Sequence, residues 1–217
     1  MTAATLDAHG AVTGSVDAQI DHADHSGHET HATSTGVSNE KVAMWAFLGS
    51  ECLLFGALIA TYLVYKGRSV NGPYPKDVFD IAFTSGTSFV LLMSSLTMVL
   101  AHSALRRGDH RRLRIWLMST VALGSIFIAG QIYEFTAFVK EGLTLSTNLF
   151  GSSFFVLTGF HGVHVTIGIL MLAALANLSR KGKLPSQRHE VVEIVGLYWH
   201  FVDVVWIVIF TVVYLIK

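Results

Sequence analysis

The sequence predicts an all-α protein, a polytopic membrane helix bundle with five transmembrane helices and a disordered N-terminal tail. Of the 217 residues, 52% are hydrophobic and 14% are charged, whereas soluble domains carry about 25% charged residues. The mean hydropathy is +0.52. Five apolar runs follow one another along the chain, each 24 residues or longer, and about 20 apolar residues suffice for a helix to cross the hydrocarbon core of a bilayer.

The five apolar runs are predicted to be helices because backbone amides in lipid find no water and must be satisfied within the segment. A transmembrane barrel would need short strands of alternating polarity, which the sequence lacks. Turn-forming and charged residues separate the runs: Gly72-Pro73 and Pro75 in the first break, and five arginines around Gly108-Asp109 in the second. The runs cover residues 42–65, 78–105, 115–139, 149–178 and 191–216.

Residues 1–41 differ in composition and are predicted to form a disordered cytoplasmic tail ahead of a transmembrane domain at 42–217. The tail has no aromatic residue, and Lys41 is its only basic residue, which is typical of disorder. Its histidines recur at every third position from residue 22 to residue 31. We favour an unstructured linker; weak binding of a transition metal, or charge switching near neutral pH, is the alternative.

The distribution of basic residues predicts the orientation of the chain in the membrane. Ten Lys and Arg residues lie on the side of the tail and of the second and fourth breaks, and five lie on the other side. Because positive charge stays in the cytoplasm, the tail is expected there and Lys217 outside. The second break could also bind anionic lipid headgroups, although ordinary topology explains its charge equally well. The headgroup candidates are His102, Arg106, Arg107 and Arg111.

Charge and cysteine content exclude several classes of protein. The 15 basic and 15 acidic residues leave no net charge, so nothing favours a nucleic-acid partner. Cys52 is the single cysteine, which excludes an internal disulfide, Cys-based zinc and iron–sulfur sites, and c-type haem attachment.

Six ionisable side chains fall within the predicted helices, where such groups are costly and usually face protein or water. At about 1.5 Å of rise per residue, five of them reach a similar depth near mid-membrane, and the sixth, Glu134, lies nearer the outside. His161/His164 and His200/Asp203 are i,i+3 pairs, so each pair shares a helical face. We expect a polar layer that forms hydrogen bonds between helices or relays protons. Its members are Glu51, Glu134, His161, His164, His200 and Asp203.

A metal or haem site is the more specific alternative function for this polar layer. The carboxylates and histidines are suitable ligand types, but carboxylate-bridged metal bundles use a Glu-x-x-His motif, which the chain lacks. We therefore expect no metal, no cofactor and no catalytic residue in this chain. Trp199 and Trp206 are expected to pack between helices, and small residues are expected to allow close helix approach. The glycines concerned are Gly124, Gly130, Gly159, Gly162 and Gly168.

Two motifs, GSSFFVLTGFHGVHV at 151–165 and YWHFVDVVW at 198–206, resemble the signatures of subunit III of the haem-copper cytochrome oxidases. Ser50-Glu51 resembles the Ser-Glu pair of that family, and AHSAL at 101–105 with Gly108-Asp109 is similar to its next helix and loop. The resemblance covers about residues 42–217. Long members have seven helices, so this chain resembles the short bacterial form that lacks the first two, which in long members help to form a phospholipid cleft.

The resemblance implies an accessory, cofactor-free subunit of a proton-pumping terminal oxidase in the bacterial plasma membrane. Subunit I, the main expected contact, would carry haem and copper and reduce oxygen to water in the aerobic respiratory chain. Subunit II, a small subunit IV, phospholipids and a respiratory supercomplex are further expected partners. The buried carboxylate of the family falls on Glu51, which we expect to be a proton-holding or hydrogen-bonding group.

Three alternatives stay open at this point. A quinol oxidase has a closely similar subunit III, so the chain does not identify the electron donor. A proton-coupled transporter could use the polar layer, but broken helices or an inverted repeat would then be expected, and neither is evident. A membrane metalloenzyme is the third.

Overall fold

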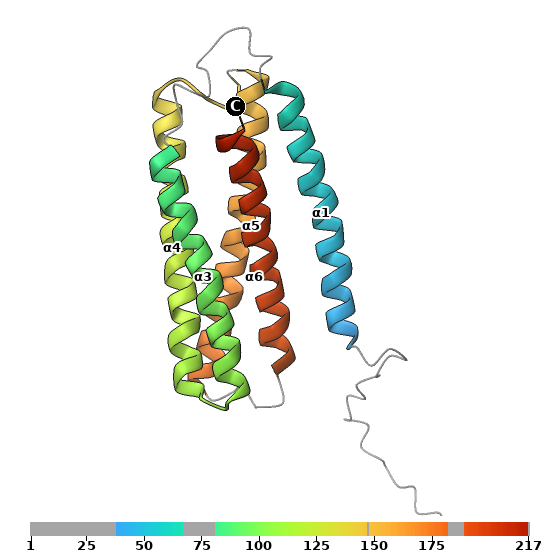
Figure 1. The fold of residues 1–217 in the computed structure, drawn as a ribbon, viewed down its shortest axis with the longest axis vertical. Coiled ribbons are helices and arrows are strands. Elements are labelled where there is room, and N and C mark those ends of the chain that lie inside the picture. The colour runs from blue at the N-terminus through green and yellow to red at the C-terminus, as the bar shows by residue number, and fades with distance from the viewer. Residues whose placement is uncertain (1–37, 67–80, 147, 182–188, 217) are drawn as a thin grey trace, which may run out of the picture. The chain divides into compact units, whose positions relative to one another are not determined.

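The structure, a computed structural model, describes residues 38–66, 81–146, 148–181 and 189–216. These residues form the five predicted helices (Figure 1), each long and apolar enough to cross a membrane, and they contain no strand. The helices are α1 (Asn39–Tyr65), α3 (Ile81–Arg106), α4 (His110–Lys140), α5 (Leu149–Arg180) and α6 (His189–Phe210), which continues into one π-helical turn, η2 (Thr211–Leu215).

The helix ends lie within a few residues of the predicted runs, and α1 and α4 begin earlier than predicted. α4 begins at His110 instead of residue 115, so part of the predicted arginine-rich break is helical. α1 begins at Asn39, inside the stretch predicted as tail, because the Ser38 carbonyl already accepts the amides of Lys41 and Val42 at 3.1 and 3.2 Å. The remaining tail with its spaced histidines, and the proline-containing break before α3, lie outside the described residues.

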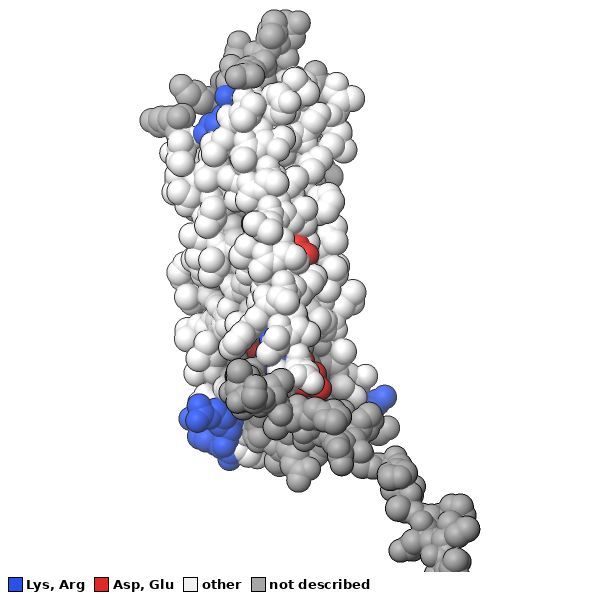
Figure 2. Space-filling model, turned by 90° about the vertical axis from the view of Figure 1, so that its right-hand side faces the viewer, with Lys and Arg blue, Asp and Glu red and all other residues white. Residues whose placement is uncertain are grey.

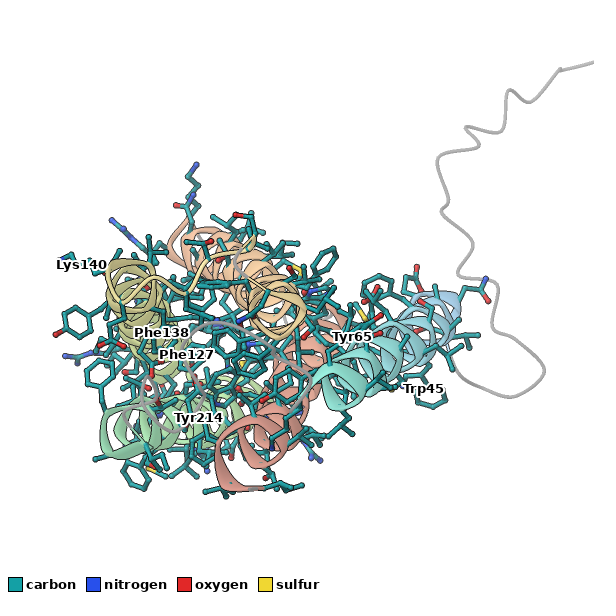
Figure 3. The ribbon with its side chains drawn as sticks, turned by 90° about the horizontal axis from the view of Figure 1, so that it is seen from above. Trp45, Tyr65, Phe127, Phe138, Lys140 and Tyr214 are labelled. Carbon is teal, nitrogen blue, oxygen red and sulfur yellow. The ribbon has the colours of Figure 1, made fainter. Side chains whose placement is uncertain are left out.

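The helices α3, α4, α5 and α6 form a ring in which each packs against the next and α6 returns to α3 (Figure 3). α1 packs outside this ring, against α5 and α6. It buries a single stripe at every seventh residue, Leu48, Phe55 and Tyr62, while large apolar side chains such as Trp45 and Leu53 are exposed. A helix that is apolar on all sides belongs in lipid or against a partner.

Basic side chains mark one end of the bundle, which we call the arginine end. The α3–α4 turn lies there with Arg106, Arg107 and Arg112, and α1 and α6 begin at this end. Figure 2 shows Lys and Arg at both ends of the visible face and an almost uncharged band between them. Gly108 has a φ of +72° in the turn, a conformation that suits glycine.

The turn at the arginine end is closed by a helix cap. The Asp109 carboxylate accepts the Arg112 amide at 2.9 Å, as an N-terminal cap should. This hydrogen bond holds the pKa of Asp109 below its ordinary value, and the nearby Arg112 and Arg107 charges act in the same direction. The cap is therefore fully effective above the ordinary pKa of aspartate and is lost as the pH falls through the lowered value.

Two glycines leave room for the largest fully buried side chain of the ring. Trp199 on α6 is fully buried, and its Nε1 donates to Ser94 Oγ on α3 at 3.0 Å. A Cβ added at Gly124 or Gly168 would come within 2.7 or 2.8 Å of the indole ring. Trp206 similarly donates to Ser88 at 2.8 Å, so both tryptophans pack between helices, as predicted.

Close approach is also present at two of the other predicted glycines. An added Cβ would lie 2.7 Å from Thr87 at Gly130 and 3.0 Å from Gln131 Oε1 at Gly162. At Gly159 it would meet nothing within 4 Å. Packing among the described helices therefore explains four of the five predicted glycines and leaves Gly159 on an open face.

Candidate functional site

The six ionisable side chains predicted to form one layer lie at four separate helix contacts. Glu51 and His164 meet between α1 and α5, and His161 lies between α5 and α6. His200 and Asp203 lie on α6, where His200 contacts α3, and Glu134 on α4 contacts α3. The structure does not bring them together because the shared face of a helix borders two neighbours, so His164 meets α1 while His161 meets α6.

The contact between Glu51 and His164 ties the outlying helix α1 to the ring. Glu51 Oε2 lies 3.1 Å from His164 Nε2, and both side chains are largely buried, at 14% and 11% exposure. Phe55, one turn along α1, packs edge-on against the His164 ring with 5.1 Å between ring centroids. A carboxyl and an imidazole group therefore meet in an otherwise apolar contact.

The hydrogen bond of the other ring nitrogen of His164 determines which protonation states the Glu51–His164 pair can adopt. Nδ1 lies 2.8 Å from the Phe160 carbonyl, which can only accept, so Nδ1 carries a hydrogen. Nε2 is then either an acceptor facing a protonated Glu51 or a donor in an imidazolium–carboxylate pair. In both states one proton lies between Nε2 and Oε2 and is shared by the two side chains.

His161 is fully buried at the centre of the ring. Its Nε2 lies 3.2 Å from the Val202 carbonyl on α6 and therefore donates to it. The imidazole lies against Trp206 at 4.8 Å between centroids and meets Phe127 edge-on at 6.0 Å. Among the described residues, Nδ1 has no hydrogen-bond partner. This histidine packs as an aromatic ring and ties α5 to α6.

His200 and Asp203 belong to the contact between α3 and α6. His200 Nδ1 lies 2.6 Å from Ser95 Oγ. Asp203 is 3% exposed, and neither of its carboxyl oxygens makes a hydrogen bond within the described part of the chain. Both ionisable residues were predicted from the sequence, whereas Ser95 was not. The recurrence of Ser and Thr at 84, 88, 94 and 95 along one helix was the available signal.

Glu134 lies near the end of the bundle opposite the arginine end. It is 6% exposed and accepts a hydrogen bond from Thr84 Oγ1, which ties α4 to α3. Its i−3 neighbour Gln131 turns to α5 instead and donates to the Thr158 carbonyl at 2.8 Å. In the described ranges, no three His, Cys, Asp or Glu side chains are grouped closely enough to hold a metal ion.

A groove of about 650 Å³ opens at the arginine end between α1, α3 and α6. We call it the α1–α3–α6 groove. Three of the predicted headgroup residues, His102, Arg106 and Arg107, line it, and His200 lines its inner part. Arg111 lies instead along a shallow depression with Arg114 and Arg180, so the structure divides the predicted lipid-binding set between two surfaces.

Fold and site together define a class of protein: a multi-pass helical membrane protein in which several buried polar side chains join neighbouring helices. The family model of cytochrome c oxidase subunit III matches residues 74–217. The chain belongs to the subunit III family of the haem-copper oxidases, as its motifs predicted.

Relatives in this family belong to oxidases with different electron donors. The chain is 41% identical to quinol oxidase subunit 3 of Bacillus subtilis (strain 168), over 90% of this chain and 97% of the relative. It is 40% identical to cytochrome c oxidase subunit 3 of Bacillus sp. (strain PS3), over 86% and 90%. It is 39% identical to cytochrome bo(3) ubiquinol oxidase subunit 3 of Pseudomonas aeruginosa, over 87% and 90%.

Proposed function

We propose that this chain is a non-catalytic subunit III that supports the haem- and copper-carrying subunit I of a terminal oxidase. The observation that carries the proposal is the match to this family across the helices that contain Glu134, His161, His164, His200 and Asp203. The buried hydrogen bonds of Glu134, His161 and His200 each join two helices of the chain, which suits a supporting role. Subunit II, a small subunit IV and phospholipids are the further partners we propose.

The Glu51–His164 pair is the group to which we assign a chemical part of this supporting role. It holds one proton at the contact through which α1 joins the ring, within the membrane-spanning part of the chain. We propose that it serves as a proton-holding group beside the oxidase core. His102, Arg106, Arg107 and Arg111 are proposed to contact anionic lipid headgroups at the arginine end, where such headgroups attract basic side chains.

The electron donor is either cytochrome c or a quinol. The identities of 41% to a quinol oxidase subunit and 40% to a cytochrome c oxidase subunit favour neither. A copper-binding or haem c domain in the accompanying subunit II would assign cytochrome c, and the absence of both would assign a quinol.

Purified alone, this chain is expected to show no haem absorption and no stoichiometric copper, because no three His, Cys, Asp or Glu side chains of the described residues gather into a metal site. The measurement is an optical spectrum together with metal analysis of the chain expressed without the other subunits. A cofactor retained in stoichiometric amount would contradict the non-catalytic assignment.

The arginine end is expected to face the cytoplasm of a bacterial plasma membrane, with the C-terminus outside. Arg107→Cys and Glu141→Cys, each in a Cys52→Ser background, place single thiols at exposed positions near opposite ends of the bundle. A membrane-impermeant maleimide should label Glu141→Cys in intact cells and Arg107→Cys only after permeabilisation. The reverse pattern would invert the topology.

A further inference from the structure

Asp203 is a buried carboxyl group for which the contacts described above provide no hydrogen bond. It is 3% exposed, and neither carboxyl oxygen makes a hydrogen bond among the described residues. An isolated carboxylate in an apolar setting is strongly disfavoured, and ionisable residues at membrane depth are characteristic of proton pathways. Asp203 therefore needs a proton, or a route by which one arrives.

Ser95 and His200 provide the next step of such a route. Asp203 lies three residues after His200 and therefore on the same face of α6, and Ser95 Oγ on α3 is 2.6 Å from His200 Nδ1. A hydroxyl group both donates and accepts, and an imidazole can take a proton at one nitrogen while it releases one from the other. The three side chains thus form a series of exchangeable protons across the α3–α6 contact.

The α1–α3–α6 groove links this series to the arginine end. His200 lines the inner part of the groove, while His102, Lys41 and Glu193 line it nearer the end of the bundle. Lys41 and Glu193 form an ion pair of 3.0 Å. Because Nδ1 of His200 is committed to Ser95, its Nε2 is the nitrogen available to a proton entering through the groove.

We propose that Asp203 is a proton-binding site that exchanges protons with the arginine end through Ser95, His200 and the groove. A proton from water binds His200 Nε2, and Nδ1 releases its proton to Ser95 Oγ. The hydroxyl proton of Ser95 passes to a carboxylate oxygen of Asp203. One proton enters and one O–H bond forms on Asp203. The reverse series, in which Asp203 gives its proton to Ser95, Ser95 gives one to His200 Nδ1 and Nε2 releases one to water, restores the first arrangement.

Of the titratable groups on the helices around α6, three have hydrogen-bond partners outside this path and one, His102, borders it. On α5, His161 donates to the Val202 carbonyl, and on α1 the Glu51 carboxyl is bonded to His164. On α3, His102 lines the same groove as His200 and lies near enough to act on it electrostatically, and on α4 Glu134 bonds Thr84. Proton exchange at Asp203 is separate from the proposed function, because it requires neither a particular electron donor nor catalytic turnover of the oxidase.

Infrared spectroscopy of the assembled complex tests the proposal. Asp203→Asn should remove one protonated-carboxyl C=O band, which identifies the Asp203 signal. Transfer from H₂O to D₂O then measures how fast this band shifts. A positioned acid–base group accelerates proton transfer by about 100-fold or more, so His200→Phe should slow the shift about 100-fold. Ser95→Ala, a smaller change, should slow it as well.

His110→Phe is the matched control, because it removes an exposed imidazole at the same end of the bundle that does not line the groove. In this control variant, the Asp203 C=O band should shift after transfer to D₂O as fast as in the wild-type complex. The proposal is overturned if no carboxyl band responds to Asp203→Asn between pH 5 and 9. It is equally overturned if exchange is unchanged in both His200→Phe and Ser95→Ala, or if His110→Phe slows it as much as His200→Phe.

Discussion

Gly168→Leu is expected to prevent normal packing of the ring and to reduce sharply the yield of assembled complex. Even the Cβ of the new side chain would lie 2.8 Å from Trp199. The indole ring cannot retreat, because Gly124 on α4 already lies so close that a Cβ there would come within 2.7 Å of it. Overpacking costs about 1 to 3 kcal/mol, and the loss of the buried Trp199–Ser94 hydrogen bond adds about 1 to 3 kcal/mol.

The measurement is the unfolding midpoint of the purified complex together with its yield from membranes. Gly86→Leu on α3 is the matched control, because an added Cβ there meets nothing within 4 Å and the position is exposed. Equal yields and midpoints for the two variants would show that Trp199 is not held between these glycines.

His164→Phe is expected to be the most damaging change to the polar contacts. The phenyl ring can still pack against Phe55, but the Glu51 carboxyl group loses its hydrogen-bond partner in a setting where it is 14% exposed. Removing one member of a buried ion pair or charged hydrogen-bonded pair costs about 3 to 5 kcal/mol. The loss should appear in the free energy of unfolding and as detachment of α1 from α5.

A double variant separates the pair from simple packing. Replacing both members of a buried pair by apolar groups is often close to neutral, so Glu51→Leu with His164→Phe should recover most of the lost stability. Glu51→Gln keeps a hydrogen-bond donor for His164 Nε2 and should assemble normally. If His164→Phe alone is no less stable than the double variant, the contact is not a coupled pair.

Sequence alone predicted the five helices because hydropathy and membrane thickness fix their number and approximate ends. Family motifs predicted the class of protein for a different reason, since two long motifs occur in the expected order. The side-chain partners could not be predicted in the same way. The i,i+3 spacing of His161 and His164 places both on one face of α5, but it does not say that this face borders both α6 and α1.

The partners contributed by neutral side chains were the hardest to predict. Glu134 was recognised as a costly buried carboxylate, but its partner Thr84 is a residue type that occurs throughout membrane helices. Ser95 was missed for the same reason, although it joins His200. The tryptophans were predicted correctly because their position well inside the last helix excludes an interfacial role, and only contacts between helices then remain.

Purification of the tagged chain from its native membrane in mild detergent tests most directly the claim that it is a supporting subunit of a haem-copper oxidase. We predict that the preparation shows haem absorption and contains oxidase subunits I and II in stoichiometric amounts. Recovery of the intact chain alone, without haem and without other oxidase subunits, would contradict the account.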